Sequence, residues 1–141
     1  MNEAHLHLLL NHTPILGSLF GLLLLAAGLF KVNQTLTQTG LVTLLVAALL
    51  CLPTQLTGEG AEEVVERIPG ITHQLIHAHE EAAELGFWAI ELTGVVALLG
   101  LLVKSRARTF TLLALLGAVL SFGLLARAGN LGGQIRHSEI R

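Results

Sequence analysis

The sequence predicts an all-α protein: a four-transmembrane-helix bundle with antiparallel, up-down connections. Of the 141 residues, 52% are hydrophobic and 13% are charged, and a mean hydropathy of +0.70 is too high for a water-soluble chain of this size. Aromatic residues make up only 4% and tyrosine is absent, which disfavours a β-barrel with aromatic girdles. Four apolar runs each have about the length that crosses a hydrocarbon core of about 30 Å.

The first two spans are separated by a polar segment. The first span is expected at about 14–30, where Pro14 suits the first turn of a helix. The stretch 31–40 is rich in Thr, Gln and Asn, and it predicts a loop. The second span is expected at about 41–56, with Pro53 near its end, where a kink costs little.

A long connection separates the second span from the third. Within it, a short acidic surface helix is expected at about 59–67. The third span, about 86–103, continues a helix that begins after Pro69 and its glycine neighbour. That helix would be about 50 Å long, so it extends beyond the membrane on the non-cytoplasmic side. The fourth span is expected at about 109–126, and all 141 residues form a single transmembrane domain.

The charged residues are divided between the two sides of the bundle. The loops after the first and third spans are basic and contain no acid, so they are expected to face the cytoplasm. Both termini then lie on the non-cytoplasmic side of a bacterial inner membrane. All ten acidic residues and all seven histidines belong to that side. The basic residues of the two loops are Lys31, Lys104, Arg106 and Arg108.

A polar stripe is predicted on the third helix. At about 100° per residue, His73, Glu84 and Glu91 fall within about 20° of one line, and His77 flanks it. Glu91 lies inside the apolar run, where an ionised carboxylate costs several kcal/mol unless it is paired, protonated or facing a wet cavity. It is therefore a functional-site candidate; the alternative is a protonated side chain that hydrogen-bonds a neighbouring group.

Histidine and carboxylate side chains bind metals and carry protons, so this stripe predicts a metal site. Pairs four residues apart, such as His73/His77 and His77/Glu81, can direct two ligands at one ion. The alternative is a solvated helix start with acids near its positive end. The candidate metal ligands are His12, His73, His77, Glu81, Glu84, Glu91 and His137.

The fourth helix supplies a second polar stripe. Arg127, Asn130 and Gln134 share one face. Arg127 could neutralise a glutamate across the bundle or hold a haem propionate, and simple interfacial snorkelling is the alternative. Histidines at the mouth of the first span and in the tail are candidates for axial ligands, against a purely structural role. The candidate cofactor-binding residues are His12, His77, Arg127, Asn130, Gln134 and His137.

Three short motifs carry a resemblance to a known family. They are His12-Thr-Pro14, the histidine-bearing third span and Leu131-Gly132-Gly133-x-x-x-His137. Together they resemble uncharacterised four-helix bacterial inner-membrane proteins of a domain-of-unknown-function family. The extra residue between His12 and Pro14 and the high glutamate content of the third helix depart from that pattern. The resemblance implies a membrane bundle with a redox site that holds b-type haem or a metal.

Three functions are compatible with these features. The first is electron transfer, alone or as a redox subunit of a larger complex, with haem b or a His/Glu-ligated iron, zinc or manganese in the periplasm-facing half. The second is a proton or cation transporter that uses Glu84 and Glu91 as a relay. The third is a structural accessory subunit. No nucleophile motif is recognisable, so an independent enzyme is not expected, although a metal-dependent oxidase is left open.

The expected partners follow from the same features. The lipid bilayer is the first, and a redox or membrane-complex partner is the second. No basic patch with interleaved aromatic residues occurs, so nucleic acid is not expected. A single cysteine gives neither a disulfide framework nor a thiolate motif. The choice between haem and a bare metal, and association into a homo-oligomer, are left open by the sequence.

Overall fold

The computed structural model describes residues 2–141, apart from the side chain of Ser138. The described chain is all helical, and four of its helices are long and apolar enough to cross a membrane, which confirms the predicted all-α class at this level. The helices are α1 (Glu3–Leu10), α2 (His12–Phe30), α3 (Gln34–Leu56), α4 (Gly58–Val65), α5 (His73–Leu102) and α6 (Ala107–Arg136), with short 3-10 turns η1 (Lys104–Arg106) and η2 (Ser138–Ile140).

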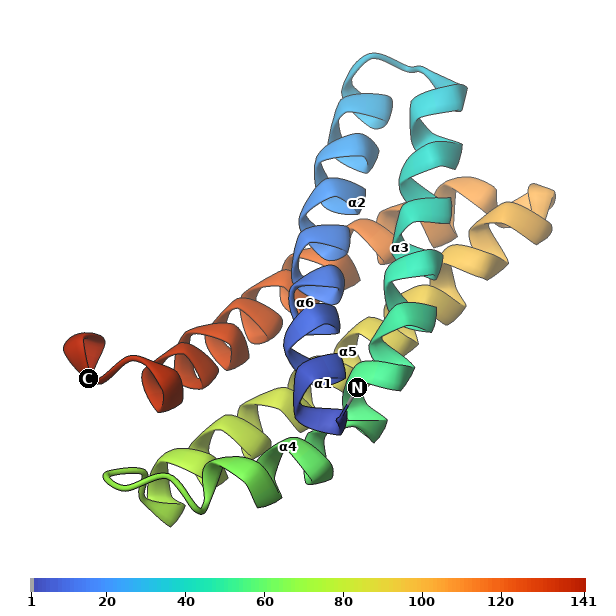
Figure 1. Ribbon diagram of the computed structural model, residues 1–141. Helices are drawn as coiled ribbons and strands as arrows, with labels where there is room; N and C mark the ends of the chain where they lie inside the picture. The colour runs from blue at the N-terminus through green and yellow to red at the C-terminus, as the bar shows by residue number, and fades with distance from the viewer. Residues whose placement is uncertain (1) are drawn as a thin grey trace.

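The four long helices form two helical hairpins that cross each other (Figure 1). A short turn joins α2 to α3, and η1 joins α5 to α6. Between the hairpins, α3 packs against α5 and α2 packs against α6, so the four helices close a ring. The short helices α1 and α4 pack together at the end of the α2–α3 hairpin that lies away from its turn (Figure 1).

Helix α3 begins earlier than its predicted span. Asn33 caps it, because the Asn33 side-chain oxygen accepts a hydrogen bond from the Leu36 amide at 3.0 Å. The hydroxyls of Thr37, Thr39 and Thr43 donate to carbonyls four residues back, at 3.0, 2.9 and 2.8 Å. Most of the stretch predicted as a polar loop is therefore helical, because its hydroxyls are satisfied by the helix's own backbone.

Helix α5 begins where its sequence predicts. Gly70 has a positive φ of 86°, which a glycine adopts without strain, and it ends the loop that leads into the helix. Thr72 then caps α5, because its hydroxyl accepts a hydrogen bond from the Leu75 amide at 3.4 Å. Both α5 and α6 have 30 residues. At about 1.5 Å per residue each is about 45 Å long, which exceeds a hydrocarbon core of about 30 Å.

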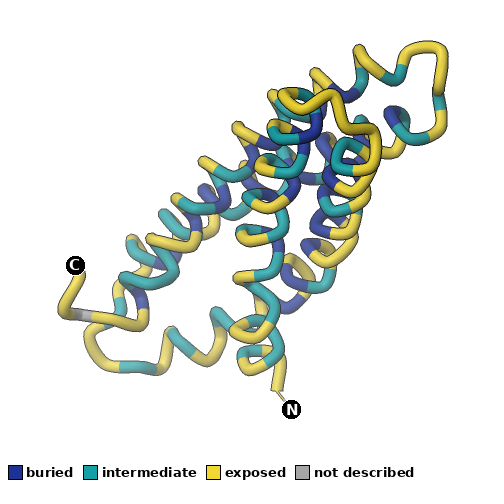
Figure 2. Tube along the Cα trace, turned by 90° about the horizontal axis from the view of Figure 1, so that it is seen from above, coloured by how far each residue is buried: buried dark blue, intermediate teal, exposed yellow. Residues whose placement is uncertain are grey.

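The core lies where the hairpins cross, and it is built largely from small residues. Leu25, Leu44 and Ile90 are fully buried among several alanines. A Cβ added at Gly94 would lie 2.5 Å from the Cβ of Ala48, so the close approach of α5 to α3 requires glycine there. Close contact through small residues is typical of membrane helices. Along the four long helices, exposed residues alternate with buried ones (Figure 2), and the exposed surface carries many leucines.

Candidate functional site: two inward-facing histidines

The histidines of the predicted α5 stripe lie on the surface. The Nδ1 atom of His73 is 3.5 Å from Glu66 Oε1, and the Nδ1 atom of His77 is 3.5 Å from Glu81 Oε1. The predicted pair His77/Glu81 is thus formed, but all four side chains are well exposed. Three of them, His73, His77 and Glu81, border an open depression of about 430 Å³. Exposed ion pairs of this kind contribute little stability, typically about 0 to 1 kcal/mol.

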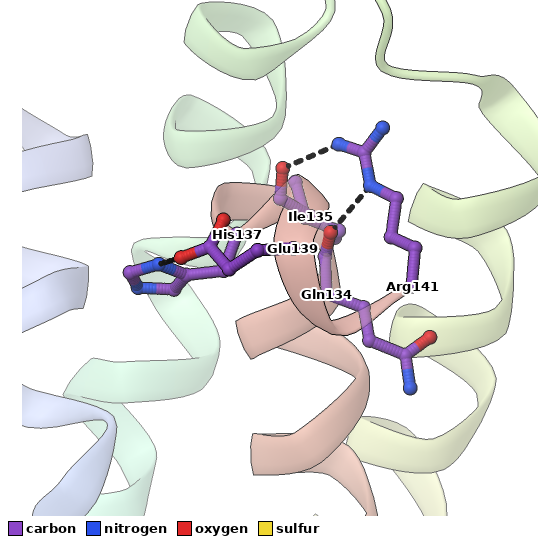
Figure 3. A network of polar contacts seen from close by, with 5 residues as sticks. All are labelled: Gln134, Ile135, His137, Glu139 and Arg141. Atoms are coloured by element: carbon purple, nitrogen blue, oxygen red, sulfur yellow. Dashed lines mark hydrogen bonds and ion pairs between the residues drawn. The ribbon is translucent and has the colours of Figure 1, made fainter.

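The other predicted ligands do not join them. His12 is exposed at the start of α2. His137 pairs with Glu139, its neighbour in the tail, with 2.9 Å between Nδ1 and Oε1 (Figure 3). Within residues 2–141, no three His, Cys, Asp or Glu side chains are grouped so that they could hold a metal ion. The structure therefore does not bring the predicted metal ligands together.

The predicted stripe of α6 also faces outward in part. Arg127 and Asn130 are exposed, and Gln134 is half-buried. The backbone carbonyl of Gln134 accepts a hydrogen bond from Arg141 Nε at 2.8 Å, and that of Ile135 accepts one from another guanidinium nitrogen at 3.0 Å (Figure 3). The third guanidinium nitrogen donates to the Gly70 carbonyl at 2.8 Å. Arg141 thus fastens the tail to the end of α6 and to the loop before α5.

Two histidines that the sequence did not single out point inward. His7 on α1 and His79 on α5 are both half-buried. His7 Nδ1 donates to the backbone carbonyl of Thr54 at 3.0 Å, and His79 Nδ1 donates to that of Ala128 at 2.9 Å. A carbonyl oxygen can only accept, so both rings carry their proton on Nδ1. In the neutral form each Nε2 then has a free lone pair.

We group the two imidazoles with their hydrogen-bond partners as the two-histidine site, defined as His7, His79, Thr54, Thr57 and Ala128. The Thr57 hydroxyl oxygen lies 3.4 Å from His7 Nδ1 and donates its own proton to nearby backbone carbonyls. The site thus combines a contact of α1 with the end of α3 and a contact of α5 with α6.

A glycine makes room for one of the two rings. A Cβ added at Gly132 would lie 3.0 Å from His79 Cε1 and 3.2 Å from its Nδ1, which is tighter than ordinary contact. A Cβ added at the next residue, Gly133, would have Ile140 Cδ1 as its nearest neighbour, at the ordinary contact distance of 3.6 Å. The absence of a side chain at Gly132 thus leaves the space that the His79 imidazole occupies. The same residue belongs to the Leu131-Gly132-Gly133 motif of the sequence.

The sequence gives only weak signals for these two histidines. His79 lies about 240° around α5 from His73, so a search for one aligned stripe passes over it. His7 stands alone among leucines in a segment before the first predicted span. Its role depends on α1 being a separate helix that lies against the end of α3 and against α4. A lone histidine in an apolar run was the one available hint.

Glu91 lies in the apolar part of α5, and its carboxyl group is partly buried there. Glu91 is half-buried, and its Oε1 atom is buried without a hydrogen-bond partner among the described residues. The buried thiol of Cys51 lies within range of its charge. Glu84, one heptad earlier on the same helix, is exposed. The two glutamates therefore have different surroundings, and only Glu91 reaches toward the interior.

On the short helix α4, one carboxyl group has a shifted pKa. A side-chain hydrogen bond with Glu80, followed by burial, raises the pKa of Glu62 on α4 above its ordinary value of 4.5. The nearby charge of His73 acts in the opposite direction on the same pKa. The neighbouring Glu80 at the start of α5 thus favours the protonated form of Glu62 on α4.

Comparisons with known proteins identify no relative for this chain. No protein-family model, no curated protein and no solved structure matches it. The resemblance to a family of four-helix membrane proteins therefore stays a prediction.

Proposed function

We propose that this chain is an integral membrane protein that binds haem b or a transition metal at the two-histidine site and serves electron transfer, alone or as a redox subunit of a larger complex. The observation that carries the proposal is the hydrogen bonding of the His7 and His79 imidazoles. Each donates its Nδ1 proton to a backbone carbonyl, which fixes the ring and leaves Nε2 as the free donor atom. Metal-bound histidines in proteins almost always make such a second hydrogen bond.

Haem is favoured over a bare ion by the number of ligands. Haem iron takes one or two axial ligands from the protein and its other ligands from the porphyrin, so two imidazoles suffice. A structural zinc ion takes four protein ligands, and no grouped set of three His, Cys, Asp or Glu side chains occurs in the described chain. When bound, haem would supply one-electron chemistry. The contribution of the chain is to hold the imidazoles from two separate helices, α1 and α5.

The charge distribution supports an antiparallel, up-down arrangement in a bacterial inner membrane with both termini outside the cytoplasm. The start of α3, the end of α5 and the start of α6 line one cavity, so the two short connections lie at the same end. That end carries Lys31 and Lys104, and the histidines belong to the other. Under the positive-inside rule, the two-histidine site then faces the periplasm.

The test is an optical spectrum of the protein purified in mild detergent, together with elemental analysis. If haem is bound, the protein should show a Soret band and contain a stoichiometric amount of iron. If a bare ion is bound, the protein should contain a stoichiometric amount of one metal and show no Soret band. Protein with neither a Soret band nor a stoichiometric metal, even after expression with added haem precursor and metal salts, would contradict both forms of the proposal.

A proton or cation path through Glu91 is the second candidate. It is supported by the buried, unpartnered Oε1 atom of that carboxyl group. In liposomes, Glu91→Gln should abolish proton or cation flux, whereas Glu84→Gln, at an exposed position on the same helix, should leave most of it. Equal flux in wild type and Glu91→Gln would exclude this function.

A further inference from the structure

A second polar site lies at the opposite end of the bundle from the two histidines. A cavity of about 290 Å³ opens between the start of α3 and the junction of α5 with α6. Its polar lining includes Gln34, Gln38, Lys104 and Thr111, and the side chains of Leu41 and Leu101 contribute an apolar part. A cavity with an apolar wall and a few convergent donors has the general form of a small-ligand site.

The charge at this end has no counterpart in the protein. Lys31, Lys104, Arg106 and Arg108 all lie in or beside the two connections, and neither connection contains an acid. The acid that precedes Lys104 in the chain is Glu91, about 20 Å away along the helix. Within the described residues, none of the four basic side chains forms an ion pair with a carboxylate. An anion from outside the chain would supply the missing charge.

Thr111 is a buried residue whose hydroxyl makes no hydrogen bond with the described chain. Thr111 is only 3% exposed and lines the cavity. Other buried threonines satisfy their hydroxyls locally: Thr54 donates to Leu50 at 3.1 Å and Thr93 donates to Ala89 at 2.7 Å. The hydroxyl of Thr111 makes no such bond within the described chain. Because Thr111 lines the cavity, its hydroxyl is available to donate to a ligand oxygen there.

Two helices also begin beside this cavity. The residues of α3 that line it belong to the first turns of that helix, and Ala107 is the first residue of α6. No side chain caps α6, because Arg106 at the N-cap position makes no capping hydrogen bond. The amide of Ala107 donates to the Lys104 carbonyl, and the start of α6 has no side-chain acceptor. Helix N-termini favour negative charge, and they add to the effect of Lys104.

We propose that this cavity binds the phosphate of an anionic glycerophospholipid head group. Lys104 supplies the charge, and the Thr111 hydroxyl and the two glutamine amides supply hydrogen bonds to phosphate oxygens. The acyl chains extend along the exposed apolar surface of the bundle, where a free phosphate would have no contact. Basic pockets between membrane helices are known to hold anionic head groups on the cytoplasmic side. The site is independent of the two histidines and of any metal.

The test is thermal unfolding in detergent with added phosphatidylglycerol, phosphatidylcholine or inorganic phosphate at equal concentrations. Phosphatidylglycerol should raise the Tm of the wild type, and the other two should not. Lys104→Gln and the isosteric Thr111→Val should each weaken the apparent affinity about tenfold. Arg108→Gln removes the same charge as Lys104→Gln at a residue that does not line the cavity, so it should respond nearly as the wild type does.

Three results would overturn the proposal. Equal responses of Lys104→Gln, Thr111→Val and Arg108→Gln would show that general charge and not the cavity attracts the lipid. An equal response to phosphatidylcholine would show that no anionic head group is selected. A response to inorganic phosphate that Lys104→Gln abolishes would assign the cavity to free phosphate and exclude the lipid. Because Thr111→Val keeps the side-chain shape, it tests the site even if Lys104→Gln folds poorly.

Discussion

The polar side chains at the two ends of the bundle differ in whether they hydrogen-bond to the protein. At one end, His7 and His79 are tied to backbone carbonyls, and each keeps a ring nitrogen free. At the other end, Lys104 and Thr111 line a cavity with no partner from the described chain. Under the two proposals, the first end gives electron pairs to a metal, whereas the second gives hydrogen bonds and charge to an anion. The proposals therefore assign two chemically different ligands to one small bundle.

The largest effect that separates the two ends is expected at Gly132. In Gly132→Ala the new Cβ presses on the His79 ring and lengthens its bond to Ala128, while Gly133→Ala meets only ordinary contact. Each change replaces a glycine within α6 by alanine, which favours the helical backbone by about 1 kcal/mol. The two variants therefore share this effect and differ in the contacts of the new Cβ. Gly132→Ala should lower the affinity for haem or metal about tenfold or more, because it disturbs the orienting hydrogen bond. Titration of the purified apoprotein measures this.

Equal affinities in the two glycine variants would show that the orientation of His79 does not matter for binding. Neither variant should change the response of the basic end to phosphatidylglycerol, because Gly132 does not line that cavity. A loss of lipid response in Gly132→Ala alone would indicate that the two ends are coupled.

A smaller effect is expected from pH at the histidine end. Glu62 has a raised pKa because of its hydrogen bond with Glu80, and the charged groups that act on it are Glu80 and His73. Its stabilising contribution is complete below the ordinary value of 4.5 and is lost as pH rises through the raised pKa of the folded state. Glu62→Gln should therefore flatten the fall in Tm above pH 4.5 and raise the Tm by a few degrees at neutral pH.

The control for this pH effect is Glu63→Gln, which removes the same charge from the neighbouring, exposed position of α4. It should leave the slope of Tm against pH close to that of the wild type. If Glu62→Gln and Glu63→Gln alter the slope equally, the raised pKa of Glu62 has no part in the stability of this end.

The smallest effect is expected for the exposed histidine of the tail. The pair of His137 with Glu139 is short, at 2.9 Å, but both side chains are largely exposed. Because an exposed pair contributes little, Glu139→Gln should change the Tm by no more than about a degree and should leave any haem or metal binding intact. A marked loss of binding in this variant would place His137 at the functional site, as the sequence predicts.

Much of the fold can be read from the sequence because a membrane fixes the length of each apolar run. The four runs predict the four long helices, and Gly70 and Thr72 mark the start of α5. The stretch 31–40 was misread because polarity alone does not distinguish a loop from a helix whose threonines donate to their own backbone. The separate helix α1 was also missed, since its apolar residues merge with the first span.

The candidate site is harder to predict, for a physical reason. His79 finds its carbonyl on α6, at Ala128, and His7 finds its carbonyl at the end of α3, at Thr54. Both contacts depend on how the helices pack against one another and on where α1 lies. The residue pattern of a single helix does not predict such contacts between helices. Glu91 could be singled out because depth in an apolar run is a property of the sequence itself.

The most direct measurement compares two pairs of histidines by optical spectrum and metal content in mild detergent. His7→Ala and His79→Ala remove the rings tied to backbone carbonyls, whereas His73→Ala and His77→Ala remove exposed rings of the predicted stripe. The two-histidine site predicts that the first pair loses the Soret band or the metal and that the second pair keeps it. Loss in the second pair with retention in the first would contradict the central claim.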